Sequence, residues 1–157
     1  MSKGIGFIFP GQGAQYIGMG KELIEEFPKA NKLINQANNI LGIDLKKICL
    51  KGPEEELNHT SNTQPAIFTV SMMASKILND KGIKPAMVAG HSLGEYSALA
   101  AAKAFSFEEG LQLVRKRGLL MDEALPAGLG SMAAIIKLEQ EKIAEICDEV
   151  DGVCEIA

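Results

Sequence analysis

Apolar and polar residues follow two patterns along this chain. Short apolar runs end at glycine or proline, and longer segments carry apolar residues every three or four positions. The first pattern predicts buried strands and the second predicts amphipathic helices. Strands are expected over residues 5–9, 85–89, 131–138 and 152–156. Helices are expected from about residue 19, over 28–42, within 52–57, and over 64–82, 93–102, 107–125 and 139–150. This alternation favours an α/β fold with a largely parallel sheet.

Local signals sharpen several of these boundaries. Pro28 suits the first position of a helix, where a missing N–H does no harm, and Gly42 ends the same helix. The Gln64-Pro65 pair predicts another helix start. Ser106 and Glu109 have the spacing of a capping box, and the helix behind them is expected to close at residues 126–128.

The composition narrows the class of protein. With 157 residues and 46% apolar content, the chain is long enough for one core. The net charge of -4, with acids and bases mixed, argues against a nucleic-acid surface. No apolar run reaches membrane-spanning length. The chain enters a strand directly after residue 4, so we expect no signal peptide and a cytoplasmic location.

Cysteine and histidine usage adds two expectations. The three cysteines, Cys49, Cys147 and Cys154, lack C-x-x-C spacing and fit free thiols that serve as small apolar residues. The two histidines, His59 and His91, form no cluster with metal-ligand spacing, so no metal site is expected.

The first candidate catalytic motif is Gly90-His91-Ser92-Leu93-Gly94. This G-x-S-x-G pentapeptide stands between an expected strand and an alanine-rich helix, as a nucleophile elbow requires. Ser92 would be the nucleophile, and the N–H of Leu93 would point at an oxyanion. The glycine-rich loop around Gln12 follows another strand and could bring a second backbone donor, the N–H of Gln12. An ordinary glycine turn remains the alternative at both places.

No convincing general base accompanies this serine. His91 immediately precedes Ser92 and is poorly placed to deprotonate it, so a supporting hydrogen-bond role fits better. His59 lies in a polar stretch and fits a solvated loop histidine. The absence of a base suggests that part of the catalytic machinery is missing.

Arg117 is a candidate for binding a carboxylate. Helical spacing puts it beside Leu113, Leu120 and Ala124, so its side chain should leave from an apolar face. A buried guanidinium needs a partner, and its planar fork suits a carboxylate. That carboxylate could be an internal Asp or Glu, or it could belong to a substrate. Arg115 and Lys116 have polar neighbours and are expected to be solvated.

Five motifs occur together and in order along nearly the whole chain: Phe9–Gln15 (FPGQGAQ), Thr63–Ala66 (TQPA), Gly90–Leu99 (GHSLGEYSAL), Arg117–Gly118, and Gly130–Ala134 (GSMAA). In this combination the chain resembles the N-terminal portion of the malonyl-CoA:acyl carrier protein transacylases of bacterial fatty-acid synthesis. The resemblance implies an α/β-hydrolase-like sheet flanked by helices over residues 1–128. Residues 129–157 would be the start of an inserted ferredoxin-like subdomain.

The resemblance also implies roles for matching residues. Ser92 would carry the acyl group, the amides of Gln12 and Leu93 would form the oxyanion hole, Arg117 would bind the malonyl carboxylate, and Gln64 would line the pocket. Malonyl-CoA and acyl carrier protein would be the substrates, with no further cofactor. The family's histidine base follows the insert, so we expect this chain alone to have little turnover. A C-terminal half, or a second copy at an open edge over 152–156, could complete it.

Two alternatives from other classes remain. A serine esterase or thioesterase of the α/β-hydrolase type would share the elbow but would not need Arg117. A non-catalytic interaction fragment would use the expected sheet edge to pair with another chain.

Overall fold

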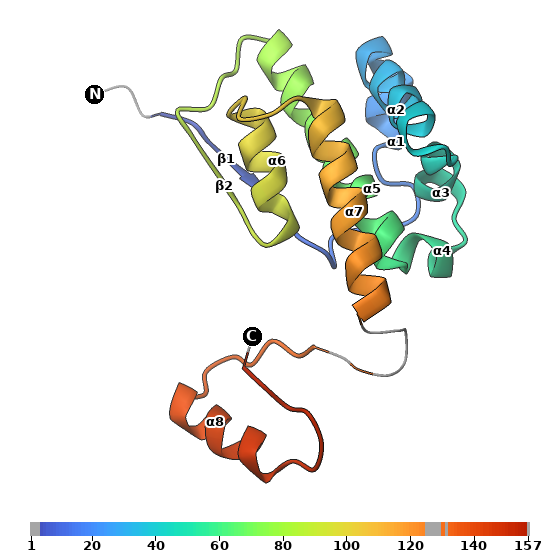
Figure 1. Cartoon of the computed structure of the whole chain (residues 1–157). Coiled ribbons are helices and arrows are strands. Elements are labelled where there is room, and N and C mark those ends of the chain that lie inside the picture. Colours follow the sequence, from blue (N-terminus) through green and yellow to red (C-terminus); the bar gives the residue numbers. More distant parts are fainter. Residues whose placement is uncertain (1–3, 125–129, 131, 157) are drawn as a thin grey trace. The chain divides into compact units, whose positions relative to one another are not determined.

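The computed structural model describes residues 4–124, 130 and 132–156. The chain divides into two compact units, Met1–Pro126 and Ala127–Ala157, and each is described by itself. Figure 1 shows the helices and strands of both. The architecture of the first unit is α/β, with helices around a small parallel sheet, as the sequence pattern predicts.

The sheet of the first unit pairs β1 (Gly6–Phe9) with β2 (Met87–Gly90) in parallel. Phe7 and Phe9 turn to one face, where they pack with Ala98 of α6. Ile8 turns to the other face and is 85% exposed. The two strands place the loop after Phe9 beside the turn after Gly90, because Phe9 and Gly90 are partners in the register.

The described part of the first unit has seven helices, of which α6 packs on the sheet: α1 (Lys21–Glu26), α2 (Pro28–Leu41), α3 (Leu45–Lys51), α4 (Glu54–Asn58), α5 (Thr60–Asp80), α6 (Leu93–Ala101) and α7 (Phe107–Ala124). Helix α5 is central and packs against α2, α6 and α7 (Figure 1). Phe68 of α5 is fully buried and stacks on Phe107 of α7, with ring centroids 5.7 Å apart. Helices α5 and α7 carry Gln64 and Arg117, two residues of the candidate site.

Several predicted boundaries are confirmed. Pro28 opens α2 and Gly42 follows it with a left-handed φ of 67°. Ser106 and Glu109 form the predicted capping box: the Glu109 carboxylate accepts from the Ser106 N–H at 2.8 Å, and Ser106 Oγ accepts from the Glu109 N–H at 3.2 Å. The expected closing residues 126–128 lie outside the described residues.

Helix α5 begins at Thr60, so the prediction that it opens at Gln64-Pro65 is wrong. Pro65 lies inside the helix and has no N–H to donate to the carbonyl of Ser61 four residues earlier. Arg115 of α7 donates to that carbonyl from Nη1 instead. A long-range partner therefore replaces the missing helical hydrogen bond. Helix α3 was not predicted, although its N-cap signal exists: Asp44 accepts from the Lys47 N–H at 3.0 Å.

The second unit contains α8 (Gln140–Glu149), close to the predicted helix. The strands expected over 131–138 and 152–156 are absent from the described residues of this unit. Lys137 has a left-handed φ of 63°, which interrupts an extended run, and Val153 is 96% exposed. Strands need hydrogen-bonded neighbours, and these segments do not pair with each other. The expected open sheet edge at 152–156 is therefore not formed.

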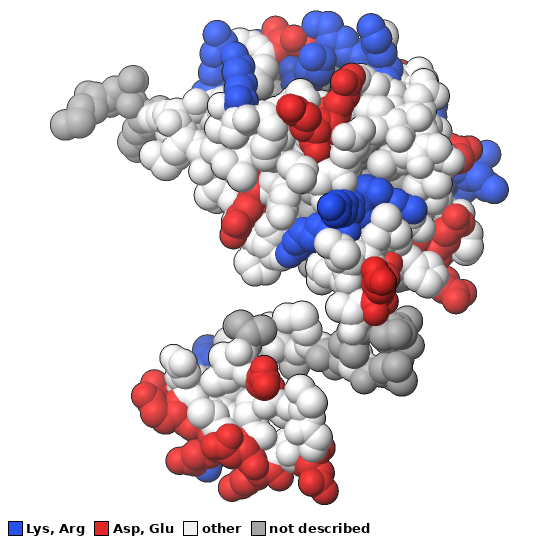
Figure 2. Space-filling view, in the orientation of Figure 1, with Lys and Arg blue, Asp and Glu red and all other residues white. Residues whose placement is uncertain are grey.

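Charge is distributed unevenly between the two units. Residues 137–155 contain seven acidic and two basic side chains, and Figure 2 shows more red than blue surface on this segment. The expectation of evenly mixed charge thus fails for this unit. Ile146 of α8 and Val150, which caps its end, are 43% and 47% exposed. Within the described residues, none of the helices has the length and apolarity needed to cross a bilayer.

Candidate active site

The predicted strand-to-helix turn lies between β2 and α6. Ser92 has φ 51° and ψ −107°, a conformation that is rare and strained for a residue with a side chain. This geometry lifts the serine out of the turn, and its side chain is exposed. Leu93 is the first residue of α6, so its N–H has no partner four residues earlier in the helix. A free donor therefore adjoins the serine.

The two glycines of the pentapeptide are needed for close packing. A Cβ on Gly90 would overlap the Gly94 carbonyl, and a Cβ on Gly94 would overlap the Phe9 carbonyl oxygen. These contacts are with backbone, which cannot move aside as a side chain tip can. The turn therefore sits directly on the end of β1.

The loop after β1 reaches the same turn. A Cβ on Gly11 would lie 2.7 Å from the carbonyl oxygen of His91. Gln12 follows immediately, and its side chain approaches Thr60 Oγ1 at 3.4 Å. Gln15 supports the loop by accepting from the Gly13 N–H at 2.8 Å and donating to Asn58 Oδ1 at 2.9 Å. The sequence reasoning missed this supporting pair.

Arg117 connects three elements at the site. Its Nη1 donates to Oε1 of Gln64 on α5 at 2.9 Å, and its Nη2 donates to Ser92 Oγ at 3.0 Å. Its guanidinium carbon lies 5.8 Å from the centre of the Tyr96 ring. Gln64 is fully buried and its Nε2 contacts Met121 Sδ at 3.1 Å. A fixed positive charge is thus held beside the exposed serine oxygen.

Two expectations about Arg117 need correction. The side chain is half-buried rather than buried, and Leu120 beside it is 53% exposed, so the face is apolar but open. None of the described Asp or Glu side chains forms an ion pair with Arg117. In the described part of the chain, the partner of Arg117 is therefore not an internal Asp or Glu. The neutral amide of Gln64 orients the guanidinium instead.

A second set of contacts fixes α7 on the first turn of α5. Arg115 donates to Ser61 O and to Asn62 Oδ1, the latter at 2.8 Å. Asp122 accepts from the Ser61 N–H at 3.0 Å. A Cβ on Gly118 would lie 2.6 Å from Ser61 Cα, so only glycine allows this approach. These contacts fix the distance between α7, which carries Arg117, and α5, which carries Gln64.

Burial shifts the pKa values of the two charged residues in this second set, Arg115 and Asp122. Desolvation lowers the pKa of Arg115, although Asp122 opposes the shift. For Asp122, burial raises the pKa, but hydrogen bonds from Ser61 and Thr60 and the charge of His59 together outweigh it, so the net pKa is lowered. Arg115 was expected to be solvated, and it is half-buried instead, because Pro65 leaves it a carbonyl to bind.

Neither histidine is hydrogen-bonded to Ser92 within the described residues. His91 is exposed, and its Nδ1 lies on the side of Gly11. His59 is exposed at the start of α5. In this structure the partner of Ser92 Oγ is therefore a cation, not a base.

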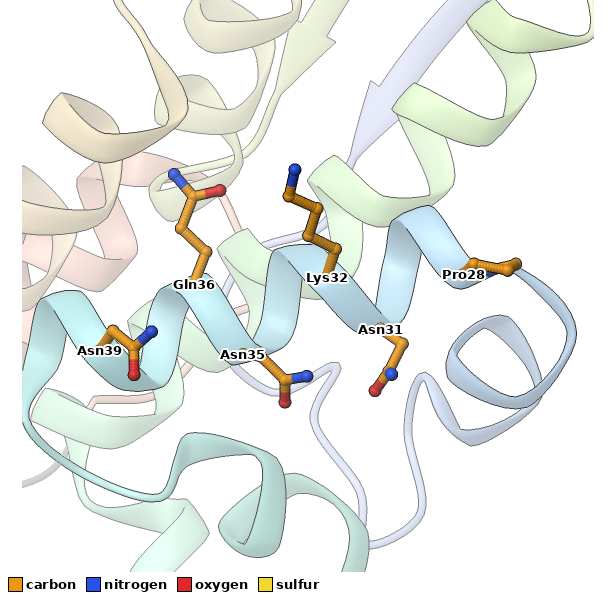
Figure 3. Close-up of a pocket in the computed structure, with 6 residues that line it drawn as sticks. All are labelled: Pro28, Asn31, Lys32, Asn35, Gln36 and Asn39. Atoms are coloured by element: carbon orange, nitrogen blue, oxygen red, sulfur yellow. The ribbon is translucent and has the colours of Figure 1, made fainter.

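A separate hollow of about 480 Å³ runs along α2 (Figure 3). Its lining is polar and comes from one helix: Pro28, Asn31, Lys32, Asn35, Gln36 and Asn39. Gln36 donates to the Glu108 carboxylate at 2.6 Å. This surface shares no residue with the turn at Ser92, and its lining includes no serine, cysteine, histidine or acid.

Comparison with known families agrees with this geometry. A family model described as "Acyl transferase domain" matches residues 6–157. The chain belongs to the acyl transferase domain family. Its relatives in this family include a malonyl CoA-acyl carrier protein transacylase of Bacillus subtilis, which is 49% identical over 150 residues, covering 96% of this chain and 47% of the relative.

Solved acyl transferases have the same fold. An acyl-carrier-protein S-malonyltransferase from Bartonella henselae matches with a TM-score of 0.90 and 44% identity, over 99% of this chain and 51% of that one. A type II polyketide malonyl-transacylase, solved in complex with its acyl carrier protein, matches with a TM-score of 0.87 and 44% identity over 94% and 48%. The chain spans about half the length of the relatives it matches.

Proposed function

We propose that this acyl transferase chain carries the nucleophile and the acyl-binding residues of a malonyl-CoA:acyl carrier protein transacylase. The observation that carries the proposal is Arg117, whose guanidinium donates to both Gln64 and Ser92 Oγ. A cation held this close to a serine suits a substrate with a carboxylate two bonds from its thioester carbonyl. Because a guanidinium can bind a carboxylate through two parallel hydrogen bonds, it would select malonyl over acetyl groups.

The reaction would proceed in two steps on Ser92. Its Oγ attacks the thioester carbonyl of malonyl-CoA, a tetrahedral oxyanion forms, and coenzyme A leaves as its thiol. The phosphopantetheine thiol of acyl carrier protein then attacks the malonyl-serine ester and regenerates the serine. The amides of Leu93 and Gln12 would stabilise both oxyanions, and no cofactor is required.

On binding, the substrate carboxylate would replace Ser92 Oγ at Nη2 of Arg117. Gln64 would keep its bond to Nη1 and hold the guanidinium plane. This exchange frees the serine oxygen for attack and fixes the acyl group next to it, which raises the effective concentration of the two reactants. His91 would have a supporting role beside Gly11.

The general base is proposed to come from residues other than His59 and His91. Neither histidine side chain is hydrogen-bonded to Ser92 in the described structure, and the relatives are about twice as long as this chain. Residues 1–128 would belong to an α/β-hydrolase-like domain, and residues 129–157 would belong to a ferredoxin-like subdomain that requires further strands. The complex of a similar transacylase with its acyl carrier protein supports the carrier as partner. The proposed location is the cytoplasm.

The test is acyl loading in a single turnover. The purified chain is incubated with malonyl-CoA or acetyl-CoA, and the mass of the peptide containing Ser92 is followed over time. We expect slow malonyl-ester formation that Ser92→Ala abolishes. Arg117→Ala should reduce malonyl loading about 30-fold relative to acetyl loading, since a charge-assisted contact contributes about 2 kcal/mol. Lys116→Ala, on an exposed neighbour, is the matched control.

Two outcomes would contradict the proposal. Equal loss of malonyl and acetyl loading in Arg117→Ala would remove Arg117 from acyl selection. Rapid release of free malonate without an ester adduct would favour a hydrolase of the esterase or thioesterase type.

A further inference from the structure

The second unit holds two cysteines at close range. Cys147 lies in the last turns of α8, and Cys154 lies on the segment that follows. Cys154 Sγ donates a hydrogen bond to Cys147 Sγ across 3.6 Å. Gly152, with φ 110°, allows the chain to turn back between them. Both thiols are free and half-buried, so small molecules in solvent can reach them.

This distance is suited to a disulfide. A disulfide bond is about 2.05 Å long, so the sulfur atoms need to approach by roughly 1.5 Å, which side-chain rotation about χ1 can supply. The third cysteine provides a contrast within the same chain. Cys49 is fully buried in the first unit, and burial raises the pKa of its thiol to about 12. A thiol in that state is inert.

The charges around the pair favour one class of oxidant. Asp148 and Glu149 follow Cys147 directly, and Glu155 follows Cys154. The hydrogen bond with Cys154 raises the pKa of Cys147, and desolvation and the charge of Asp148 act in the same direction. These effects favour the neutral thiol form of Cys147. An anionic oxidant such as glutathione disulfide would be repelled here, whereas a neutral hydroperoxide would not.

We propose that Cys147 and Cys154 form an oxidisable thiol pair that hydrogen peroxide converts into an intramolecular disulfide. One sulfur, as thiolate, attacks a peroxide oxygen, the O–O bond breaks, and a sulfenic acid and one water form after proton transfer. The second sulfur attacks the sulfenic sulfur, the S–O bond breaks, and a second water leaves. The two thiols lose two electrons and two protons, and the peroxide is reduced to two waters.

The bond would close a short loop at the end of α8. No residue of α8 is buried, so the described part of this unit has little apolar packing to hold that helix end. The disulfide would therefore tie the last turn of α8 to the segment 150–155 and order both.

The test uses the whole reduced chain and hydrogen peroxide. After treatment, the protein is denatured, alkylated with N-ethylmaleimide and weighed. We expect one alkylated cysteine instead of three and a loss of about 2 Da before alkylation, the mass of two hydrogens. Cys147→Ser and Cys154→Ser should instead stop at a sulfenic acid that a 1,3-dione reagent traps. Hydrogen exchange at the end of α8 should slow in the oxidised chain.

The two cysteines are close in sequence, so a disulfide could also form without the fold. Comparing the folded chain with the unfolded chain separates these two effects. Because the folded unit holds the sulfurs together, disulfide formation should be about tenfold faster in buffer than in concentrated urea. Equal rates in the two solvents would overturn the proposal. So would disulfide-linked dimers as the main product, over-oxidation of both thiols without a cross-link, or faster reaction with glutathione disulfide than with peroxide at equal concentration.

Discussion

The contact between Arg115 and Ser61 O can be tested by removing either of the features that create it. Arg115→Ala should destabilise the first unit, because the Ser61 carbonyl then has neither a helical N–H nor the guanidinium as donor. A hydrogen bond from a charged donor contributes about 1.5–3 kcal/mol. Arg115 is half-buried, so we expect a loss of about 2 kcal/mol. That corresponds to a fall in Tm of about 4–8 °C for a chain of this size.

The decisive variant is the double substitution. Pro65→Ala restores an N–H that can donate to Ser61 O within α5, so it should cost less stability in the Arg115→Ala background than in the wild-type chain. The cavity left by the buried ring of Pro65 appears in both comparisons and cancels. The expected coupling between the two substitutions is about 1 kcal/mol, the net contribution of one backbone hydrogen bond.

Urea unfolding of the four proteins, followed by far-UV circular dichroism, measures this coupling. Lys116→Ala, on the exposed neighbour of Arg115, is the control and should be neutral. Additivity of the two substitutions to within about 0.4 kcal/mol would refute the reasoning. In that case Arg115 would stabilise the chain by some means other than the carbonyl that Pro65 leaves free.

Three further substitutions test the packing around the site and one helix cap. Gly118→Ala should lower stability by about 1 kcal/mol, since a clash at Ser61 Cα outweighs the better helix propensity of alanine; a variant more stable than wild type in urea would contradict this. Gly94→Ala should cost about 3 kcal/mol because its Cβ meets the backbone of Phe9, and an unchanged urea midpoint would argue against the close approach. Asp44→Ala should cost about 1 kcal/mol at neutral pH through loss of the α3 cap. The hydrogen bond from the Lys47 N–H lowers the pKa of Asp44 below its ordinary 3.8, so this contribution is present above 3.8 and disappears as pH falls through the lower folded value. Parallel pH titrations of the two proteins should therefore converge in acid.

Short-range features of the fold were predictable because their chemistry is local. The capping box at Ser106 and Glu109 involves residues three apart, and the turn at Ser92 needs only a strand, two glycines and a helix start. The position of Gln64 near Arg117, by contrast, was implied by resemblance alone. Their contact spans 53 residues, and no periodicity in either helix reveals it.

The errors have a common physical origin in partners that are distant along the chain. Pro65 resembles a helix start when α5 is considered alone, but the Arg115 guanidinium, 54 residues from Ser61, donates to the Ser61 carbonyl in place of the missing N–H. The apolar runs near Met132 and Val153 have the composition of strands. They are not strands here, because a strand requires a paired neighbour and the described structure supplies none.

The sequence by itself therefore determined the local elements: the elbow at Ser92, the helix caps and the alternation that makes an α/β fold. It also supplied the residue types that suggest acyl transfer. The tertiary structure decided which of those residues meet. It placed Arg117 between Gln64 and Ser92, gave Arg115 a carbonyl to bind and brought Cys147 to Cys154. Those contacts depend on how helices approach one another, and close approach is controlled by backbone contacts, as at Gly118, that hydrophobic patterns do not encode.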